Sequence, residues 1–339
     1  MRLSRTPLLA IAMLSAMPLP RQAGAGQNNS YVGSWALTVP GGYAGWLGVE
    51  ERDGKLAASI MWIGGSVVPV QGARMTGNEL VLVRRHQWEE TDTVSKKVPK
   101  AATETITAVR SGDNLALTTI TRPGRNGSEP KAETFTGKLL PPMPATPDLS
   151  KVRFGRPIQI FNGKDLTGWR LTDPNAANGW KVENGELINE VVQTPGAPHK
   201  NYGNLRTDRE FNDFRLTLEV NVPKDGNSGV YLRGVYEVQV EDSYGQPADP
   251  HHMGAVYSRV KPTATVEKPA GEWQTMDITL VDRHVTVILN GTKIIDNQPV
   301  LGPTGGALWS DVMRPGPIYL QGDHAGVSYR NILLRPVQR

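Results

Sequence analysis

Short runs of alternating side chains, separated by turns rich in glycine and proline, constrain this chain more than any other feature. Phe214 to Val222 reads FRLTLEVNV, in which apolar and polar residues alternate as in a half-buried strand. Asn290-Gly291 stands between two further apolar runs and predicts a tight hairpin turn with positive φ at both residues. No segment of ten or more residues in the second half has a convincing helical period. The sequence therefore predicts an all-β protein.

A proline-rich segment divides the chain. Residues 140–153 (LPPMPATPDLSKVR) contain four prolines, which fix φ and remove backbone donors. Such a segment joins neither a helix nor the interior of a sheet. It predicts a linker between a first β region at 30–139 and a second at 154–339.

The first region reads as a series of close sequential strands. Trp35 to Val39 is followed by Pro40-Gly41-Gly42, and Arg52-Asp53-Gly54-Lys55 predicts another hairpin. This pattern predicts an antiparallel meander, closed or nearly closed, and Gly33-Ser34-Trp35 resembles the opening of lipocalin-like barrels. Such a region would hold a ligand in its mouth or, the favoured alternative, pack on the second region as an accessory domain. His86 has no catalytic partner near it in the sequence.

The N-terminus has the features of an export signal. Residues 1–25 begin with basic side chains, continue through the apolar run Leu8 to Met17 and end in Ala23-Gly24-Ala25. The apolar run is too short to cross a bilayer. We therefore expect a signal peptide and a periplasmic or extracellular protein. The chain has no cysteine, so it forms no disulfide and has no thiol nucleophile.

Charge argues against a nucleic-acid partner. The chain has 37 basic and 33 acidic side chains, and three of the basic ones lie in residues 1–25. The rest is nearly neutral and contains no cluster of Lys and Arg that would follow a phosphate backbone. A neutral surface suits an uncharged ligand such as a sugar.

A row of polar side chains is the first candidate site. Glu237, Gln239 and Glu241 alternate with Val238 and Val240, so the three polar residues project from one face of a strand. Such a row is also what the solvated face of a half-buried sheet looks like. The neighbouring aromatics Tyr231 and Tyr236, with glycines that permit close backbone approach, favour a site. Arg233 joins the row if it keeps the strand phase through Gly234, although a purely structural ion pair with Glu237 is equally open.

A glycine-flanked loop is the second candidate. Gln321, Asp323 and His324 lie in LQGDHAG, and histidine is the side chain best suited to exchange protons near neutral pH. A lone loop histidine is also often a plain surface residue. His199 lies in another loop, which we expect at the rim of a cleft.

The evidence for a metal site is weak. Asp249-Pro250-His251-His252 lacks the ligand spacing of a zinc site and has no third ligand nearby in sequence. A structural calcium ion bound by loop oxygens is the more common case in β-sandwiches and has no recognisable motif here. Trp273 alternates against the apolar residues Met276, Ile278 and Leu280, so we expect it to face away from the core, where a sugar would stack on it.

An ordered series of motifs resembles a known family. FNGKDLTGW at 161–169 is followed by NSGVYLRG at 227–234, YEVQVED at 236–242, PAGEWQ at 269–274, LNG at 289–291 and LQGDH at 320–324. Together they are similar to the 3-keto-disaccharide hydrolase family, also described as 3-keto-glucoside 1,2-lyase and 3-keto-2-hydroxyglucal hydratase. The resemblance covers about residues 155–337. The last motif usually reads Gln-X-His-Gly, and this chain has one residue more.

The resemblance implies a concanavalin-like jelly roll and a place in bacterial, exported carbohydrate metabolism. It also implies a glycoside oxidised to a ketone at C3, which acidifies the proton at C2. A base would remove that proton, the C1 substituent would leave with help from an acid, and water would add to the product. From chemistry alone we assign Glu237 as base and His324 as acid, with Asp323 or Asp242 orienting His324.

The remaining candidates would hold the sugar. Arg233 and Gln239 would donate hydrogen bonds to ring oxygens or the enolate, and Glu241, Gln321, Tyr231 and Trp273 complete the predicted substrate-binding set. A divalent cation would stabilise the oxyanion, although the sequence shows no site for one.

Two other functions stay open at this stage. Jelly rolls also serve as carbohydrate-binding modules, which need the cleft and the hydrogen-bond donors without a catalytic base. A scaffold role for the first region is the third alternative, and no repeat or coiled-coil pattern supports it.

Overall fold

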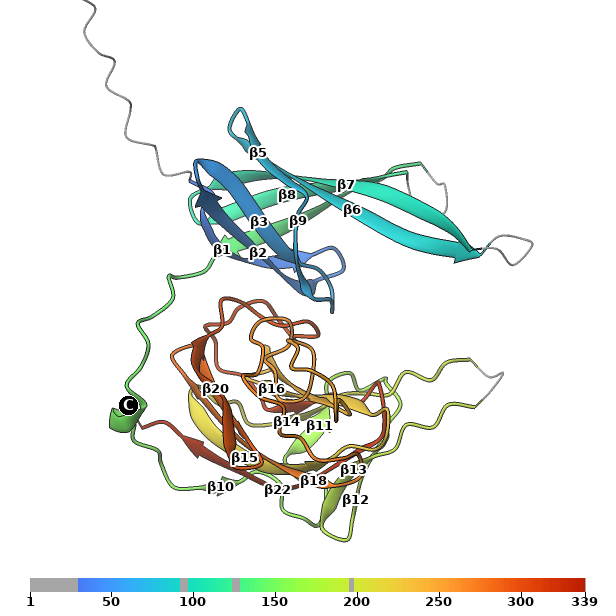
Figure 1. Cartoon of the computed structure of the whole chain (residues 1–339), viewed down its shortest axis with the longest axis vertical. Helices are drawn as coiled ribbons and strands as arrows, with labels where there is room; N and C mark the ends of the chain where they lie inside the picture. The colour runs from blue at the N-terminus through green and yellow to red at the C-terminus, as the bar shows by residue number, and fades with distance from the viewer. Residues whose placement is uncertain (1–29, 92–96, 124–128, 195–197, 339) are drawn as a thin grey trace, which may run out of the picture. The chain divides into compact units, whose positions relative to one another are not determined.

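Three antiparallel sheets dominate the computed structural model (Figure 1), which describes residues 30–91, 97–123, 129–194 and 198–338. The all-β prediction is confirmed. The only helical element of the described residues is one 3-10 turn at Leu149–Lys151. The signal peptide predicted at 1–25 lies outside the described residues. In the part that the structure describes, no helix is long and apolar enough to cross a membrane.

The first sheet contains nine strands within the described residues. They are β1 (Gly33–Val39), β2 (Tyr43–Arg52), β3 (Lys55–Met61), β4 (Val67–Pro69), β5 (Gly72–Thr76), β6 (Glu79–Thr91), β7 (Lys97–Ser111), β8 (Asn114–Arg122) and β9 (Ala132–Leu139). Their order is β4-β3-β2-β1-β9-β8-β7-β6-β5, so two meanders meet where β1 pairs with β9. The predicted antiparallel meander is confirmed.

Local chemistry explains the tight connections of this sheet. In the predicted β2–β3 hairpin Arg52 pairs with Lys55, and Asp53 and Gly54 both have positive φ, as a two-residue turn requires. Alternate residues of the strands form a buried core that includes Trp35, Leu37, Leu47, Ile60 and Leu82.

One polar cluster is buried in the first sheet. Glu104 accepts hydrogen bonds from Arg84 Nη1 (2.8 Å) and Thr119 Oγ1 (2.7 Å), and its Oε2 lies 3.0 Å from His86 Nε2. His86 therefore has a partner that the sequence did not reveal, because Glu104 is on the neighbouring strand of a long hairpin. We interpret this ionic cluster as structural.

The second and third sheets form a sandwich. The eight-stranded sheet consists of β10 (Ile158–Gln159), β12 (Trp180–Glu183), β13 (Glu186–Asn189), β15 (Phe214–Asn221), β18 (Trp273–Val281), β19 (His284–Leu289), β20 (Thr292–Pro299) and β22 (Val327–Pro336) among the described residues. The five-stranded sheet, counted in the same part of the chain, consists of β11 (Trp169–Leu171), β14 (Leu205–Thr207), β16 (Asn227–Leu232), β17 (Tyr236–Glu241) and β21 (Tyr319–Leu320). This architecture is the expected jelly-roll sandwich.

Apolar side chains between the two sheets hold the sandwich together. β15 alternates as predicted, with Leu216 and Leu218 buried, and they belong to one cluster with Val230, Val238 and Ile278. Burial of each such side chain contributes about 1.5–3 kcal/mol. The predicted Asn290-Gly291 turn joins β19 to β20, and both of its residues have positive φ.

The proline-rich segment contributes no strand, as predicted. It is nevertheless fixed to the sandwich, because the Pro141 carbonyl accepts from Arg283 Nη1 (3.0 Å) and the Pro147 carbonyl accepts from Asn297 Nδ2 (2.8 Å). Asp148 caps the 3-10 turn by accepting from Ser150 N–H. The division into two domains at this segment stays a prediction.

Both faces of strand β17 are covered. Val238 and Val240 face the core of the sandwich, while Glu237 and Gln239, on the opposite face, are buried as well. A polar row on a solvated sheet face would be exposed, so this strand does not have the ordinary solvated face that the sequence left as an alternative. The face of the five-stranded sheet that carries Glu237 and Gln239, called the second face below, is therefore covered by other parts of the chain and can enclose a site.

Candidate active site

A cavity of about 240 Å³ lies on the second face of the five-stranded sheet. The candidates Glu237, Gln239 and Tyr231 line it together with the candidates from the second cluster, Gln321, Asp323 and His324. The remaining lining residues are Gly64, Asn204, Asn227, Tyr257, Gly305, Gly306 and Tyr319. Six of the ten predicted site residues, from segments more than eighty positions apart, therefore meet in one cavity.

Strand register brings the floor of this cavity together. Tyr231 on β16 is paired with Glu237 on β17 and, on its other side, with Tyr319 on β21. One step along the sheet, Gln239 is paired with Gly229, whose carbonyl accepts the Gln321 N–H (3.0 Å). Because directly paired residues project from the same face, the two rows of side chains point into the cavity together.

The Glu237 carboxyl is the most perturbed acid in the cavity. Its residue is only 4% exposed, and burial raises the pKa of Glu237 to about 8. The nearby Tyr231 hydroxyl lowers this pKa in part, and the negative charge of Asp323 raises it. Glu237 is therefore largely protonated in the free protein at neutral pH and gains a negative charge just above it.

Close backbone approach fixes the position of the Glu237 side chain. A Cβ built on Gly229 would overlap Glu237 Oε1, so only glycine leaves room for the carboxyl at this point of β16. The Glu237 N–H donates to Thr304 Oγ1 (2.9 Å), and the Glu237 carbonyl accepts the Tyr257 N–H (3.0 Å).

Two stacked tyrosines form the middle of the floor. The rings of Tyr231 and Tyr319 are 3.9 Å apart and nearly parallel, and their hydroxyls donate to the carbonyls of Gly305 (2.7 Å) and Gly306 (3.1 Å). Burial raises the pKa of both hydroxyls well above 10. They stay protonated and hold the loop at Gly305 and Gly306 against the sheet.

Two buried amide oxygens in the cavity lack a protein donor. Gln239 Oε1 and Gln321 Oε1 are inaccessible to solvent, and no donor among the described residues reaches them. A buried acceptor without a partner costs roughly 1–3 kcal/mol. Both side chains line the cavity, and rotation of either amide towards it would let a ligand hydroxyl donate to its oxygen, which suits a sugar.

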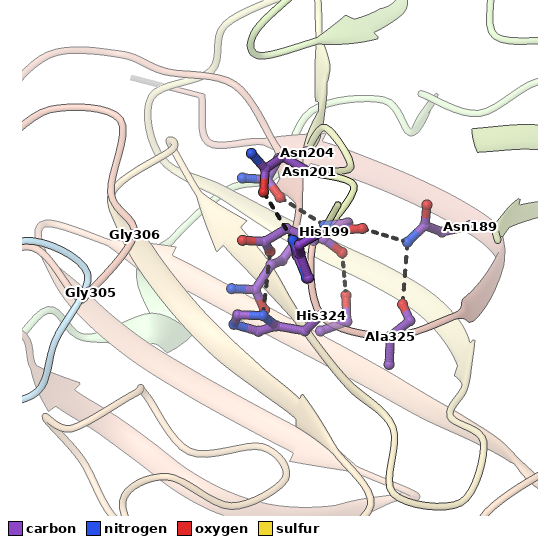
Figure 2. A network of polar contacts seen from close by, with 12 residues as sticks. Asn189, His199, Asn201, Asn204, Gly305, Gly306, His324 and Ala325 are labelled. Atoms are coloured by element: carbon purple, nitrogen blue, oxygen red, sulfur yellow. Dashed lines mark hydrogen bonds and ion pairs between the residues drawn. The ribbon is translucent and has the colours of Figure 1, made fainter. Parts of the chain in front are cut away.

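The loop that carries His324 is held by two asparagines (Figure 2). Asn189 Nδ2 donates to the carbonyls of Gly322 (3.0 Å) and Ala325 (3.3 Å), and Asn204 Oδ1 accepts the Gly322 N–H (2.8 Å). The imidazole of His324 is about half exposed, with its Nδ1 3.8 Å from Asp323 Oδ1. The longer form of the family's motif thus still places a histidine at the cavity.

Four predicted site residues do not line the cavity, and Arg233 is the clearest correction. The strand ends before it: Arg233 has a φ of 54° in the β16–β17 turn, so the alternation that would have aligned it with Glu237 is broken. Its guanidinium is buried and donates to the Val312 carbonyl (2.8 Å) and Asn212 Oδ1 (3.2 Å). It neither pairs with Glu237 nor reaches the cavity.

The other three lie elsewhere for simple reasons. Trp273 begins β18 in the opposite sheet, out of phase with the core as predicted, and its ring is covered by the Arg330 guanidinium at 3.9 Å. Asp242, beyond the end of β17, accepts the Asp225 N–H (2.9 Å). Glu241 keeps the phase of Glu237 but lies farther along the strand, where burial raises its pKa and the neighbouring His252 and His251 lower it.

The remaining histidine candidates are occupied by hydrogen bonds. His251 Nδ1 lies 2.8 Å from Asp249 Oδ1 and its Nε2 lies 2.9 Å from Ser66 Oγ. His199, expected at a cleft rim, bonds to Asn201 (Figure 2) and does not line the cavity. No group of three or more His, Asp or Glu side chains in the described ranges is placed to hold a metal ion.

Several cavity residues were missed by sequence reasoning. Asn204 and Tyr257 come from irregular segments, and nothing in the sequence next to them marks a site. Tyr319 carried a usable signal, since it is two residues before Gln321 and shares its face.

Comparison with known proteins identifies the family of the sandwich region. The family model of the 3-keto-alpha-glucoside-1,2-lyase-like domain matches residues 156–335, about half of the chain. A 3-keto-disaccharide hydrolase of Bacteroides thetaiotaomicron is 25% identical over 166 residues, which are 41% of this chain and 57% of that protein. The chain thus matches less than two thirds of the length of this relative.

Two solved structures from Parabacteroides distasonis, each described as a candidate glycosyl hydrolase, are also similar. The first is 30% identical, with a TM-score of 0.43, and the match covers 59% of this chain and 94% of the other. The second is 20% identical, with a TM-score of 0.45, and the match covers 54% of this chain and 94% of the other.

The raised pKa of Glu237 predicts a specific dependence of stability on pH. Between the ordinary pKa of 4.5 and the folded value of about 8, the folded protein binds a proton that the unfolded chain has lost. This contribution to stability is complete below about pH 4.5 and is lost as the pH rises to about 8. Its size is on the order of a few kcal/mol.

The Glu237→Gln variant cannot titrate at this position. We expect its melting temperature to fall less between pH 5 and pH 8 than that of the unaltered protein. Glu133→Gln, at an exposed glutamate on β9, serves as the control and should follow the unaltered protein. Parallel pH profiles for all three proteins would contradict the burial of an acidic Glu237.

Proposed function

Because this chain belongs to the family of 3-keto-alpha-glucoside-1,2-lyase-like domains, we propose that it is a carbohydrate-active enzyme that cleaves 3-keto-glycosides by elimination across C1 and C2 followed by hydration. The observation that carries the proposal is the buried carboxyl of Glu237, whose pKa is raised to about 8, on the floor of a cavity with two unpartnered amide oxygens. A carboxyl tuned to titrate just above neutral pH is suited to proton transfer.

The first step needs a base at C2. The C3 ketone acidifies the C2 proton, and the Glu237 carboxylate takes it while the C2 electron pair forms an enolate with the ketone. The burial that raises the pKa of Glu237 also makes its carboxylate a stronger base than an exposed glutamate. The contacts that Gly229 and Thr304 make with Glu237 hold this residue in the position that a general base needs.

The second step expels the leaving group. The enolate collapses, the bond from C1 to the glycosidic oxygen breaks, and that oxygen takes a proton from His324. Water then adds its hydroxyl to C1 and a proton to C2, so the sum is hydrolysis without any oxidant. His324 is half exposed at the mouth of the cavity, which suits contact with a departing group and with water.

The cavity residues that remain would recognise the ring. With Arg233 turned away, Gln239 and Gln321 are the amides that face the ring, and their free oxygens accept from sugar hydroxyls. Their amide N–H groups are candidate donors to the enolate oxygen. We also retain export as part of the proposal, on the basis of residues 1–25.

A carbohydrate-binding module is the alternative function. The two unpartnered amide oxygens would serve it equally well. A binding module, however, has no need for a buried carboxyl whose pKa lies near neutral pH. The raised pKa of Glu237 therefore favours the enzyme.

The first experiment offers the full chain a 3-keto-glucoside and the same glucoside without oxidation. We expect turnover of the keto form only, because an unoxidised ring lacks the acidified C2 proton. Glu237→Gln should lower kcat/KM by roughly 10²- to 10⁴-fold, the usual contribution of a general base. Glu133→Gln should have no effect. Retention of both glycosides without turnover of either would instead identify a binding module, and turnover that survives Glu237→Gln would exclude Glu237 as the base.

The role of His324 is tested by varying the leaving group. An alkoxide leaving group needs protonation, whereas a nitrophenolate departs without it. We expect His324→Gln to lower kcat/KM for an alkyl 3-keto-glucoside at least tenfold more than for the nitrophenyl 3-keto-glucoside. An equal loss with both substrates would show that His324 is not the acid.

Gly229 provides a test of how Glu237 is positioned. A methyl group at Gly229 would displace the Glu237 carboxyl, so Gly229→Ala should lower kcat at least tenfold in a folded protein. Gly72→Ala is the matched control, because an added Cβ there meets only the Val83 side chain at 3.6 Å. Unchanged kcat in folded Gly229→Ala would mean that the position of Glu237 does not limit the reaction.

A further inference from the structure

One wall of the cavity comes from the first sheet. Gly64 lies in the turn between β3 and β4, more than a hundred residues before any other residue that lines the cavity. It packs directly on the opposite wall: a Cβ on Gly305 would lie 2.6 Å from the Gly64 carbonyl oxygen and 2.7 Å from that of Gly65. Two backbones are therefore in contact beside Glu237.

Hydrogen bonds fix this turn to the sandwich. The Val67 N–H donates to Ser258 Oγ (2.8 Å), and Ser66 Oγ bonds to His251 Nε2 (2.9 Å). Ser258 directly follows Tyr257, a cavity residue whose N–H bonds to the Glu237 carbonyl. The turn is thus attached next to the cavity by the two residues, Ser66 and Val67, that closely follow Gly64.

A second contact supports the opposite wall from behind. The guanidinium of Arg259 lies over the ring of Trp46 on β2, 4.1 Å from its centre, and donates to the Pro303 carbonyl through Nη2 (2.6 Å) and Nε (3.2 Å). Pro303 directly precedes Thr304, which accepts the Glu237 N–H. A continuous series of contacts therefore runs from Trp46 to Glu237.

We propose that the β3–β4 turn, residues 62–66, closes one side of the cavity at Gly64, so that the site accepts a single terminal sugar ring and excludes a ring that is substituted on both sides. Arg259 and Trp46 act as positioning residues for the loop that carries Thr304, Gly305 and Gly306. This proposal deepens the proposed function and rests on it for the identity of the sugar.

The size of the cavity supports the proposal. Its volume of about 240 Å³ is below the roughly 300–1,000 Å³ of sites for drug-sized ligands. A ring within a polymer carries a chain at C1 and another on the far side, for example at O4, and both sides must then be open. With one side closed by backbone, only the C1 side is left for the leaving group.

The activity test adds a side chain to the wall. Gly64 and Gly77 have φ near +60°, a conformation that asparagine tolerates, and an added Cβ meets no atom within 4 Å at either position. Gly77 lies in the β5–β6 turn and does not line the cavity, so Gly77→Asn is the matched control. We expect Gly64→Asn to lower kcat/KM for a methyl 3-keto-glucoside at least tenfold relative to Gly77→Asn, with similar melting temperatures.

Substrate selection gives a second measurement on the unaltered protein. A methyl 3-keto-glucoside should be turned over at least a hundredfold more efficiently than its 4-O-glucosylated counterpart. Equal turnover of the two substrates, or equal activity of Gly64→Asn and Gly77→Asn, would contradict the proposal that the β3–β4 turn closes one side of the cavity. If the unaltered protein turns over neither substrate, the proposed function fails.

The contact itself is tested without a substrate. Trp46→Leu, Arg259→Gln and the double variant form a cycle whose melting temperatures report whether the two residues interact. We expect the double variant to lose clearly less than the sum of the single losses. Additive losses would overturn the contact between the two residues, and this outcome does not depend on any turnover.

Discussion

The burial of one carboxyl on the second face of the five-stranded sheet is the constraint on which the rest of the site depends. Placing Glu237 away from water is unfavourable for its charged form, and none of the described ion pairs includes Glu237 to offset this. The protein instead leaves the group protonated near neutral pH. The surroundings of Glu237 keep the carboxyl buried: glycine at position 229 leaves room for it, Thr304 accepts its backbone N–H, and the stacked rings of Tyr231 and Tyr319 lie beside it.

Much of this arrangement follows from strand periodicity. Alternation along 236–241 placed Glu237 and Gln239 on one face, and the structure confirms that face as the floor of a cavity. The hairpin turns at Asp53-Gly54 and Asn290-Gly291 were also predicted from the sequence, because few residue types adopt positive φ at two successive positions. Strand alternation and turn preferences were therefore enough to predict features that depend only on neighbouring residues in the sequence.

The other features of the site depend on contacts between residues that are far apart in the sequence, which alternation and turn preferences do not predict. Arg233 does not keep the phase of the polar row, because its left-handed backbone conformation ends the strand and turns its side chain away from the cavity. Glu241 has the predicted phase but lies beyond the cavity, since periodicity fixes a face and not a distance. Asn204 and Thr304 lie in irregular segments that fold onto the sheet, and Asn189 ends strand β13 of the opposite sheet. Nothing next to them in the sequence marks these contacts.

The apolar cluster of the sandwich includes Ala36, Trp46 and Met61 of the first sheet together with Leu140. If the chain were cut at the proline-rich segment, the apolar side chains of the sandwich that pack against the first sheet would be exposed to water. Exposed apolar surface favours self-association. Arg259 would keep its hydrogen bonds to Pro303 but lose its contact with the indole of Trp46. Residues on both sides of the proline-rich segment thus share one apolar cluster.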